Sequence, residues 1–323
     1  MSKRFLSRFL KIFVIIFPIS TGVIATLYGL YLYNRTQMFY YEDRAIPPGF
    51  LIFSSMELSS VNLSIQIIDL NFERGRSDKA VMFCDFDLAS PLTEDQTIGF
   101  QFPYVLEKFI YFEFNIQPFE SEIINIQPFE SEVIREIVPP SDGAKQTEVT
   151  IAYFRFKPNP AVKHYSFNGF FIWSGFLSRT DYATYKFVVP FARDERALHS
   201  SIGGILPNAK IRYVTQGESD HAFVMVNAAA NVKAAFPMPD SVMGLHGYSL
   251  QMLTWELSHS GTMGQEISPS LDEVVAYFEI SSEAEQRNRY LYEAGIYTGL
   301  GVSLLFSGIY EALKALEESR KTR

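Results

Sequence analysis

The histidines are the first side chains to consider for metal or acid–base chemistry. No two of them have the four-residue spacing by which one helix face holds a metal, since they stand at His164, His199, His221, His246 and His259. The chain has a single cysteine, so no Cys-x-x-Cys metal pair exists either. We therefore expect neither a metal nor a cofactor.

Ser219, Asp220 and His221 are the side-chain types of a catalytic triad. Neighbours in sequence seldom converge on one reacting atom, and a polar, glycine-containing run precedes them, so we predict a turn. The segment Gly244-Leu-His-Gly247 predicts a loop. The segment Ser201-Ile-Gly-Gly204 lacks the lysine of a phosphate-binding loop, and no nucleophile elbow or dinucleotide fingerprint occurs.

Paired carboxylates would offer a different chemistry, because two of them can act as acid and base on a glycosidic bond. Glu57, Asp85 and Asp87 are available, but nothing in the sequence places them in one cleft. Trp173 and Trp255 are candidates to line a sugar-binding surface, yet each stands in an apolar run, which favours core packing. The sequence thus disfavours an enzyme without excluding one.

One motif, Asn-Ile-Gln-Pro-Phe-Glu-Ser-Glu, occurs twice, as residues 115–122 and 125–132. In a strand, a shift by the even period of ten keeps each side chain on the same face, whereas in a helix it would rotate the motif away. Pro118 and Pro128 confine the segment to a sheet edge or a loop. Its glutamates lack the spacing of a calcium loop, so we predict a solvated, extended edge segment.

The composition suits a chain that lies partly in lipid and partly in a β-sheet core. It is 47% hydrophobic, 15% aromatic and only 20% charged, and its 18 tyrosines and 29 phenylalanines favour strands. Its one cysteine excludes an internal disulfide, which points to a bacterial or archaeal envelope. Cys84 has apolar neighbours, so we predict a buried strand residue.

Residues 12–33 contain no charged side chain and are long enough to cross a bilayer as a helix, which needs about 20 residues. Residues 1–11 are basic and are expected in the cytoplasm. The apolar run is too long for a signal peptide and has no Ala-x-Ala cleavage site, so we predict an uncleaved anchor. Residues 34–48 then form a short tether.

Residues 291–310 form the second candidate transmembrane helix, with Glu293 as its one charge. Ser282 and Glu285 form a capping box, which predicts a helix that begins there, forms a stalk over residues 281–290 and continues unbroken to about Glu318. The basic residues of the tail, 311–323, place the C-terminus in the cytoplasm as well.

The distribution of charge agrees with this topology. The whole chain has a net charge of −8. Residues 1–33 carry +4 and residues 311–323 carry +1, so residues 34–310 must carry −13. An acidic domain is repelled by an anionic cytoplasmic leaflet, so we expect the middle of the chain on the other side of the membrane.

Small residues recur every four positions in both apolar segments. Such spacing lets helix backbones approach closely in lipid, and we select as the helix-packing interface Thr21, Ala25, Gly29, Gly295, Gly299 and Ser303. The pattern favours pairing of the chain's own two helices. An interface with a partner membrane protein or a second copy stays open.

Residues 49–280 show the alternation of strands with one buried face, as in residues 61–67, 149–153, 185–189 and 274–280. The runs 170–173 and 222–226 look buried on both faces. With roughly ten to thirteen strands, the predicted fold class is mainly β: an extracytoplasmic, antiparallel β-sandwich-like domain flanked by two transmembrane helices. A division into two packed sandwiches would fall near residues 139–143.

These features lead to three functional hypotheses. The first is a two-span envelope protein of the cell membrane whose β domain is a binding or assembly module for another membrane protein or an envelope component. The alternatives are an enzyme acting on envelope glycans or lipids, and an accessory subunit of a channel or transporter. The lipid bilayer is the expected partner, and the acidic charge with no basic stripe argues against nucleic acid.

Overall fold

The computed structural model describes residues 3–37, 49–72, 78–90, 95–116, 124–126, 128, 130–138, 147–157, 163–191, 201–213, 219–244, 250–258 and 273–321. The chain forms two compact units. The helical unit comprises residues 1–40, 180–183 and 281–323, and the β unit comprises residues 41–179 and 184–280.

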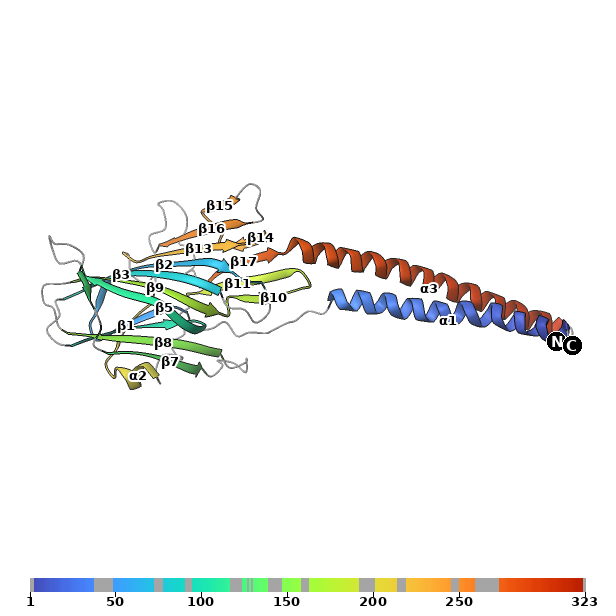
Figure 1. Cartoon of the computed structure of the whole chain (residues 1–323), viewed down its shortest axis with the longest axis horizontal. Coiled ribbons are helices and arrows are strands. Elements are labelled where there is room, and N and C mark those ends of the chain that lie inside the picture. The colour runs from blue at the N-terminus through green and yellow to red at the C-terminus, as the bar shows by residue number, and fades with distance from the viewer. Residues whose placement is uncertain are drawn as a thin grey trace, which may run out of the picture. The chain divides into compact units, whose positions relative to one another are not determined.

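The β unit contains three sheets (Figure 1). The five-stranded sheet has the order β12-β1-β4-β8-β7, the four-stranded sheet β10-β11-β17-β14, and the eight-stranded sheet β15-β16-β13-β2-β3-β9-β5-β6. The strands are β1 (Leu51–Ser54), β2 (Leu58–Leu70), β3 (Asp78–Leu88), β4 (Gln96–Phe102), β5 (Val105–Ile116), β6 (Ile124–Ile126), β7 (Glu130–Val138), β8 (Thr147–Phe156), β9 (His164–Ser174), β10 (Leu177–Arg179), β11 (Thr184–Pro190), β12 (Lys210–Tyr213), β13 (His221–Ala228), β14 (Asn231–Phe236), β15 (Ser241–Gly244), β16 (Gln251–Ser258) and β17 (Glu273–Glu279).

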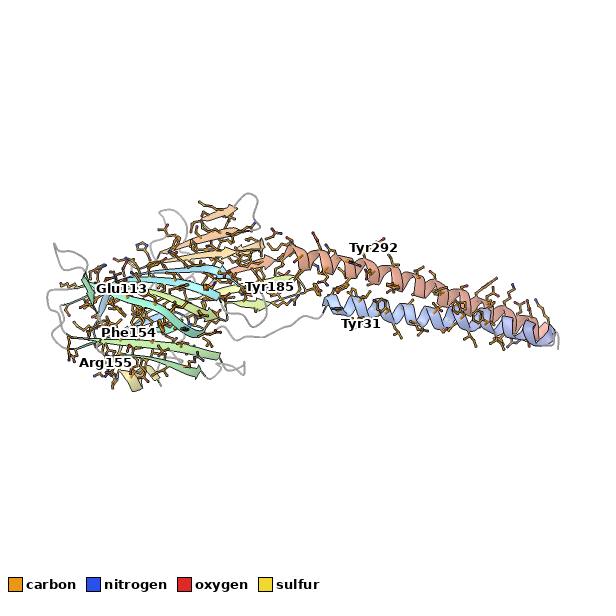
Figure 2. All side chains as sticks on the ribbon, in the orientation of Figure 1. Tyr31, Glu113, Phe154, Arg155, Tyr185 and Tyr292 are labelled. Carbon is orange, nitrogen blue, oxygen red and sulfur yellow. The ribbon has the colours of Figure 1, made fainter. Side chains whose placement is uncertain are left out.

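All three sheets contribute side chains to one buried core, which gives the unit its sandwich-like packing. Much of this core is aromatic. The ring of Phe154 on β8, labelled in Figure 2, lies 4.8 Å from that of Phe114 and 5.8 Å from that of Phe167, so it packs against β5 and β9 of the eight-stranded sheet. The predicted mainly β class is confirmed, with more strands than the sequence indicated.

The eight-stranded sheet is mixed rather than antiparallel. Strand β13 pairs in parallel with β2, with Val224 opposite Ile65, while β13 and β16 are antiparallel. A hairpin forces antiparallel pairing, but the long stretch of chain between β2 and β13 leaves either direction open. The prediction of a wholly antiparallel domain is therefore wrong at this pair.

The five-stranded sheet is covered on both faces, because the short helix α2 (Ser201–Ile205) packs on the face turned away from the main core. Ile202 of α2 lies in a second apolar cluster with Leu51, Phe53 and Ile151. Gly99 makes room for this cluster, since a Cβ there would lie 2.0 Å from the Phe53 ring. We predicted no helix for these residues from the sequence.

Among the described residues of the repeated motif, those of the second copy that form strands lie on edge strands, in agreement with the predicted edge segment. Asn115 and Asn125, the first residues of the two copies, face each other in the β5–β6 pair. Strand β6 ends the order of the eight-stranded sheet, and β7, which holds the end of the second copy, ends that of the five-stranded sheet. Residues 117–123, 127 and 129 lie outside the described residues, as does the predicted boundary at 139–143.

The helical unit consists mainly of α1 (Lys3–Gln37) and α3 (Ser281–Lys321). Both are long and apolar enough to cross a membrane, judged by length and composition. Helix α3 is continuous from Ser281, in agreement with the predicted capping box, and residues 34–37 of the expected tether belong to α1. Tyr31 and Tyr292 project outward from the two helices (Figure 2).

Candidate functional site

Helices α1 and α3 pack antiparallel through glycines. A Cβ added at Gly22 would lie 2.7 Å from the carbonyl oxygen of Gly301, and one added at Gly301 would lie 2.7 Å from the carbonyl oxygen of Gly22. A Cβ at Gly308 would meet Ile19, whose backbone nitrogen is 3.2 Å away. The backbones are therefore in direct contact, with no room for side chains at these points.

Only part of the predicted packing interface takes part in this pairing. Gly29 does, because a Cβ there would lie 2.8 Å from the backbone nitrogen of Thr298, and Thr21 and Ala25 are half-buried. Gly295 and Gly299 do not, since no atom of the described residues lies within 4 Å of a Cβ at either.

Ser303 is also exposed, and its hydroxyl donates 2.8 Å to the Gly299 carbonyl of its own helix. The seam of α3 instead runs through Gly301 and Gly308, seven positions apart, which is the repeat of two supercoiled helices rather than a strict spacing of four. An interface with a partner through Gly295, Gly299 and Ser303 stays a prediction.

Aromatic contacts continue the packing of the two helices toward the C-terminal end of α1 and the N-terminal end of α3. The Tyr28 and Tyr297 rings meet edge to face, 4.9 Å apart, and the Arg35 guanidinium lies 4.9 Å from the centre of the Tyr290 ring. Both contacts match the antiparallel register of the glycines, so they help to fix how the helices align.

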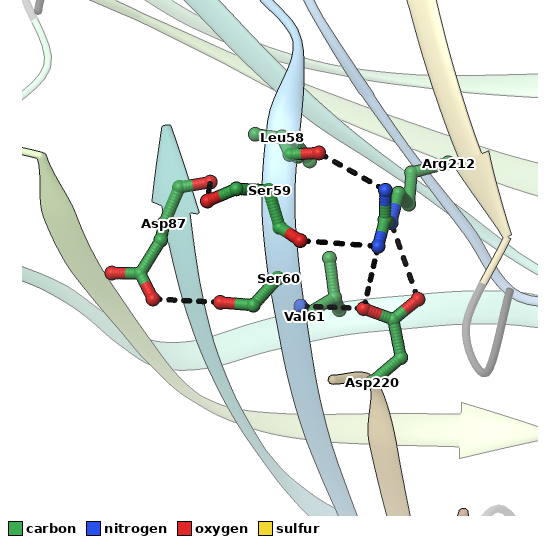
Figure 3. Close-up of polar contacts among 7 residues, drawn as sticks. All are labelled: Leu58, Ser59, Ser60, Val61, Asp87, Arg212 and Asp220. Carbon is green, nitrogen blue, oxygen red and sulfur yellow. Dashed lines mark hydrogen bonds and ion pairs between the residues drawn. The ribbon is translucent and has the colours of Figure 1, made fainter. Parts of the chain in front are cut away.

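The triad-like segment of the β unit is structural. Asp220 is fully buried and accepts hydrogen bonds from Arg212 Nη2 at 2.8 Å and from the Val61 backbone N–H at 3.0 Å (Figure 3). Arg212 also donates to the carbonyl oxygens of Leu58 and Ser59, at 3.0 and 3.3 Å. Because Arg212 belongs to the five-stranded sheet and β2 to the eight-stranded one, this cluster joins two sheets.

Of the remaining candidates for acid–base chemistry, Asp85 and Asp87 lie two residues apart on the outward face of β3. Asp87 is held by the Ser60 hydroxyl at 2.6 Å and by His164 Nδ1 at 2.9 Å. Asp85 lies across from Asn62 and Ser166 on the two neighbouring strands. The described residues include no cluster of three or more His, Cys, Asp or Glu that could hold a metal. His199, His246 and His259 lie outside them.

Trp173, Trp255 and Cys84 are buried, in agreement with the sequence interpretation. The Trp255 Nε1–H donates to the Pro237 carbonyl at 2.9 Å, and the Trp173 ring lies 4.6 Å from that of Phe176. Burial raises the pKa of the Cys84 thiol, which removes the thiolate needed for reactivity. None of the three is available to a ligand.

Asp78 is a buried acid that the sequence did not single out. Its carboxylate accepts a hydrogen bond from the Asn71 backbone N–H at 2.8 Å, where β2 and β3 approach their connection. Burial raises the pKa of Asp78 to about 7, with the nearby charges of Asp69 and Glu107 adding to the effect. Asp78 follows a polar segment and belongs to no motif, so the sequence did not indicate that it is buried.

The outer face of the eight-stranded sheet carries an uncharged surface. On its four central strands, two adjacent rows of outward positions contain no ionisable side chain. We call these positions the central strip: Phe223 and Met225 of β13, Ser64 and Gln66 of β2, Phe83 and Val81 of β3, and Asn168 and Phe170 of β9. All are half-buried or exposed, and Phe83 is 39% exposed.

Charged residues border the central strip. In the row of Phe83, the next strands outward contribute Glu256 on β16 and Glu113 on β5. In the next row along β3, Asp85 stands beside Asn62 and Ser166. In the row of Val81 the surface continues to Thr254 on β16 and Tyr111 on β5. Charged residues therefore border it at both ends of the Phe83 row and on the Asp85 side, as at recognition surfaces with an apolar centre and a polar rim.

Sequence reasoning missed the central strip because its strands looked buried on both faces. The runs 170–173 and 222–226 are apolar throughout, yet Phe170, Ile172, Phe223 and Met225 point away from the core and are only half-buried. The prediction of two buried faces is wrong for these runs. Which outward residues are neighbours depends on strand order, and the sequence does not encode that locally.

Comparison with known proteins does not assign the chain to a family. No protein-family model matches it, and no curated protein matches its sequence. Among solved structures, it is similar to a Legionella pneumophila protein provisionally assigned as nutrient-binding, at 10% identity and a TM-score of 0.37, over 75% of this chain and 72% of that one. Likeness at this level supports no functional argument. The chain's own structure defines it as a mainly β protein with two long apolar terminal helices.

Proposed function

We propose that the protein is a two-span membrane protein whose β unit serves as a binding module for an envelope component. Helices α1 and α3 would cross the bilayer as an antiparallel pair, with both termini in the cytoplasm. The basic residues 1–11 and the net charge of −13 on residues 34–310 support this topology.

The central strip is the observation that carries the binding role. A concave site with facing carboxylates would have favoured an enzyme, whereas an uncharged, partly apolar surface bordered by charged residues is typical of recognition. On an acidic domain, eight neighbouring outward positions free of charge form such a surface. We infer that this face contacts another molecule.

The test is co-purification of full-length protein from membranes of its native host in a mild detergent. Val81→Glu places a charge within the central strip, and Val133→Glu makes the same change at an exposed position on edge strand β7. We expect a stoichiometric component to accompany the wild type and Val133→Glu but not Val81→Glu. Equal retention by both variants, or a solitary wild-type protein, would contradict the proposal.

One observation also supports the accessory-subunit alternative. Gly295 and Gly299 face away from α1, with no described atom within 4 Å of a Cβ at either, and small residues in lipid let a further helix approach. Changing both to leucine should then remove a membrane-protein partner while α1 and α3 stay paired. A partner that survives this change would exclude the alternative.

A further inference from the structure

We infer that the central strip binds a neutral glycan chain. This inference rests on the proposed binding role and names its ligand. Three properties of the strip point to this class of ligand: its chemistry, its size and its free polar groups.

The chemistry of the central strip alternates between rings and neutral polar groups. Phe223, Ser64 and Phe83 lie side by side in one row, so a hydroxyl stands between two aromatic side chains. Sugar rings present apolar C–H faces that pack on aromatic rings and hydroxyls that bond to neutral partners. An anionic ligand would lose its hydration here without meeting an opposite charge, and the bordering Glu113 and Glu256 would repel it.

The size of the central strip suits a narrow ligand. Strands lie about 4.8 Å apart and same-face residues about 6.7 Å apart, so eight positions cover roughly 260 Å². A stable protein interface needs about 800 Å² from each partner. The strip alone is therefore too small for a folded protein, while its width of about 14 Å across four strands accommodates a short run of sugar rings.

The polar groups of the central strip are available. The side-chain amide of Asn168 has no hydrogen-bond partner among the described residues, although it is half-buried beside Phe83. The Gln66 amide makes only a long contact, 3.4 Å, with the Ser64 hydroxyl. A partly desolvated amide gains most from a ligand that supplies the missing hydrogen bond, and a sugar hydroxyl can donate as well as accept one.

The test is titration calorimetry on the full-length protein in lipid nanodiscs, which avoids detergents with sugar headgroups. The probes are neutral hexamers of N-acetylglucosamine, β-1,4-glucose and α-1,4-glucose, with an oligogalacturonate hexamer as the charged comparison. We expect one of the three kinds of neutral hexamer to bind. Phe83→Ala should weaken it by about tenfold, as for a central aromatic contact, and Asn168→Ala by several-fold.

Phe236→Ala is the matched control, because Phe236 is an exposed phenylalanine of the same unit that lies off the strip, and we expect it to leave affinity unchanged. Melting curves confirm that each variant is folded. Failure of all three neutral hexamers, tighter binding of the oligogalacturonate, or equal weakening by Phe236→Ala would overturn the inference. If a protein partner is still lost with Val81→Glu, the binding role stands and only the glycan is wrong.

Discussion

Gly22 of α1 and Gly301 of α3 lie face to face, and each occupies the space into which a Cβ of the other helix would project. This reciprocal contact makes a simple prediction for the helix pair. Gly301→Leu should separate the helices, at a cost of about 1–3 kcal/mol for overpacking, whereas Gly295→Leu on the open face of α3 should not.

The measurement is disulfide crosslinking between cysteines introduced in place of Tyr28 and Tyr297, whose rings are in contact. A crosslink should form in the otherwise wild-type chain and with Gly295→Leu, and should be lost with Gly301→Leu. Crosslinking that resists Gly301→Leu would show that the glycine seam does not hold the pair.

The Arg212–Asp220 pair predicts that substituting Asp220, in the triad-like segment 219–221, strongly destabilises the protein. Asp220→Ala leaves the Val61 N–H without its acceptor and the Arg212 guanidinium without its counter-ion, so we expect a loss of about 3–5 kcal/mol. His221→Ala, at the exposed neighbouring position, should change stability by less than about 0.5 kcal/mol. Denaturant unfolding compares them, and similar losses from both would show that the pair does not join the sheets.

Asp78 predicts a dependence of stability on pH. Its pKa is raised from 3.8 to about 7, so the folded protein keeps a proton that the unfolded chain releases. Stability should therefore fall as pH rises from about 4 to about 7 and then level off. Asp78→Asn, which keeps an acceptor for the Asn71 N–H, should flatten this part of the profile.

Asp95→Asn is the control for Asp78, since Asp95 is exposed and paired with Lys157. Thermal melts at several pH values would show the difference. A profile that Asp78→Asn leaves as steep as the wild type would mean that another group titrates in this range.

The repeat predicts that one copy is dispensable. Deleting residues 124–133 brings Glu120-Ser-Glu-Ile123 directly before Ile134, where Glu130-Ser-Glu-Val133 stood. The contacts of Glu130 with Arg155 and of Glu132 with Tyr153 can then be restored in register, so we expect a folded protein. The melting temperature of the deletion variant and its yield in membrane extracts show whether it is folded.

Deleting residues 124–134 is the matched control for the repeat. One residue more shifts the alternation, so the glutamates turn to the other face of the strand and lose both contacts. We expect this variant to be clearly less stable than the shorter deletion. Equal stability would mean that edge strand β7 does not depend on these side chains.

The sequence predicted the elements whose signals are local. Long apolar runs predicted α1 and α3, a capping box predicted where α3 begins, and alternation predicted β2, β8, β11 and β17. What it could not predict depends on contacts between distant segments. The parallel pairing of β13 with β2, the Arg212–Asp220 bond across two sheets and the rows of the central strip all require strand order.

The dependence on contacts between distant segments also explains why the glycines of the helix seam were only partly predicted. Spacing by four marked Gly295 and Gly299, but the seam follows a repeat near 3.5 that only a partner helix selects, and Gly301 and Gly308 lie on it. Helix α2 was missed because five residues carry too little periodicity to detect.

Cys84 is an intrinsic probe of local unfolding in the eight-stranded sheet. It is the single thiol, it is buried on β3 between β2 and β9, and its pKa is raised by burial. A thiol reagent can reach it only when the middle of the eight-stranded sheet separates. The labelling rate of the unmodified protein, in intact membranes, therefore measures how often that sheet opens, without any introduced probe.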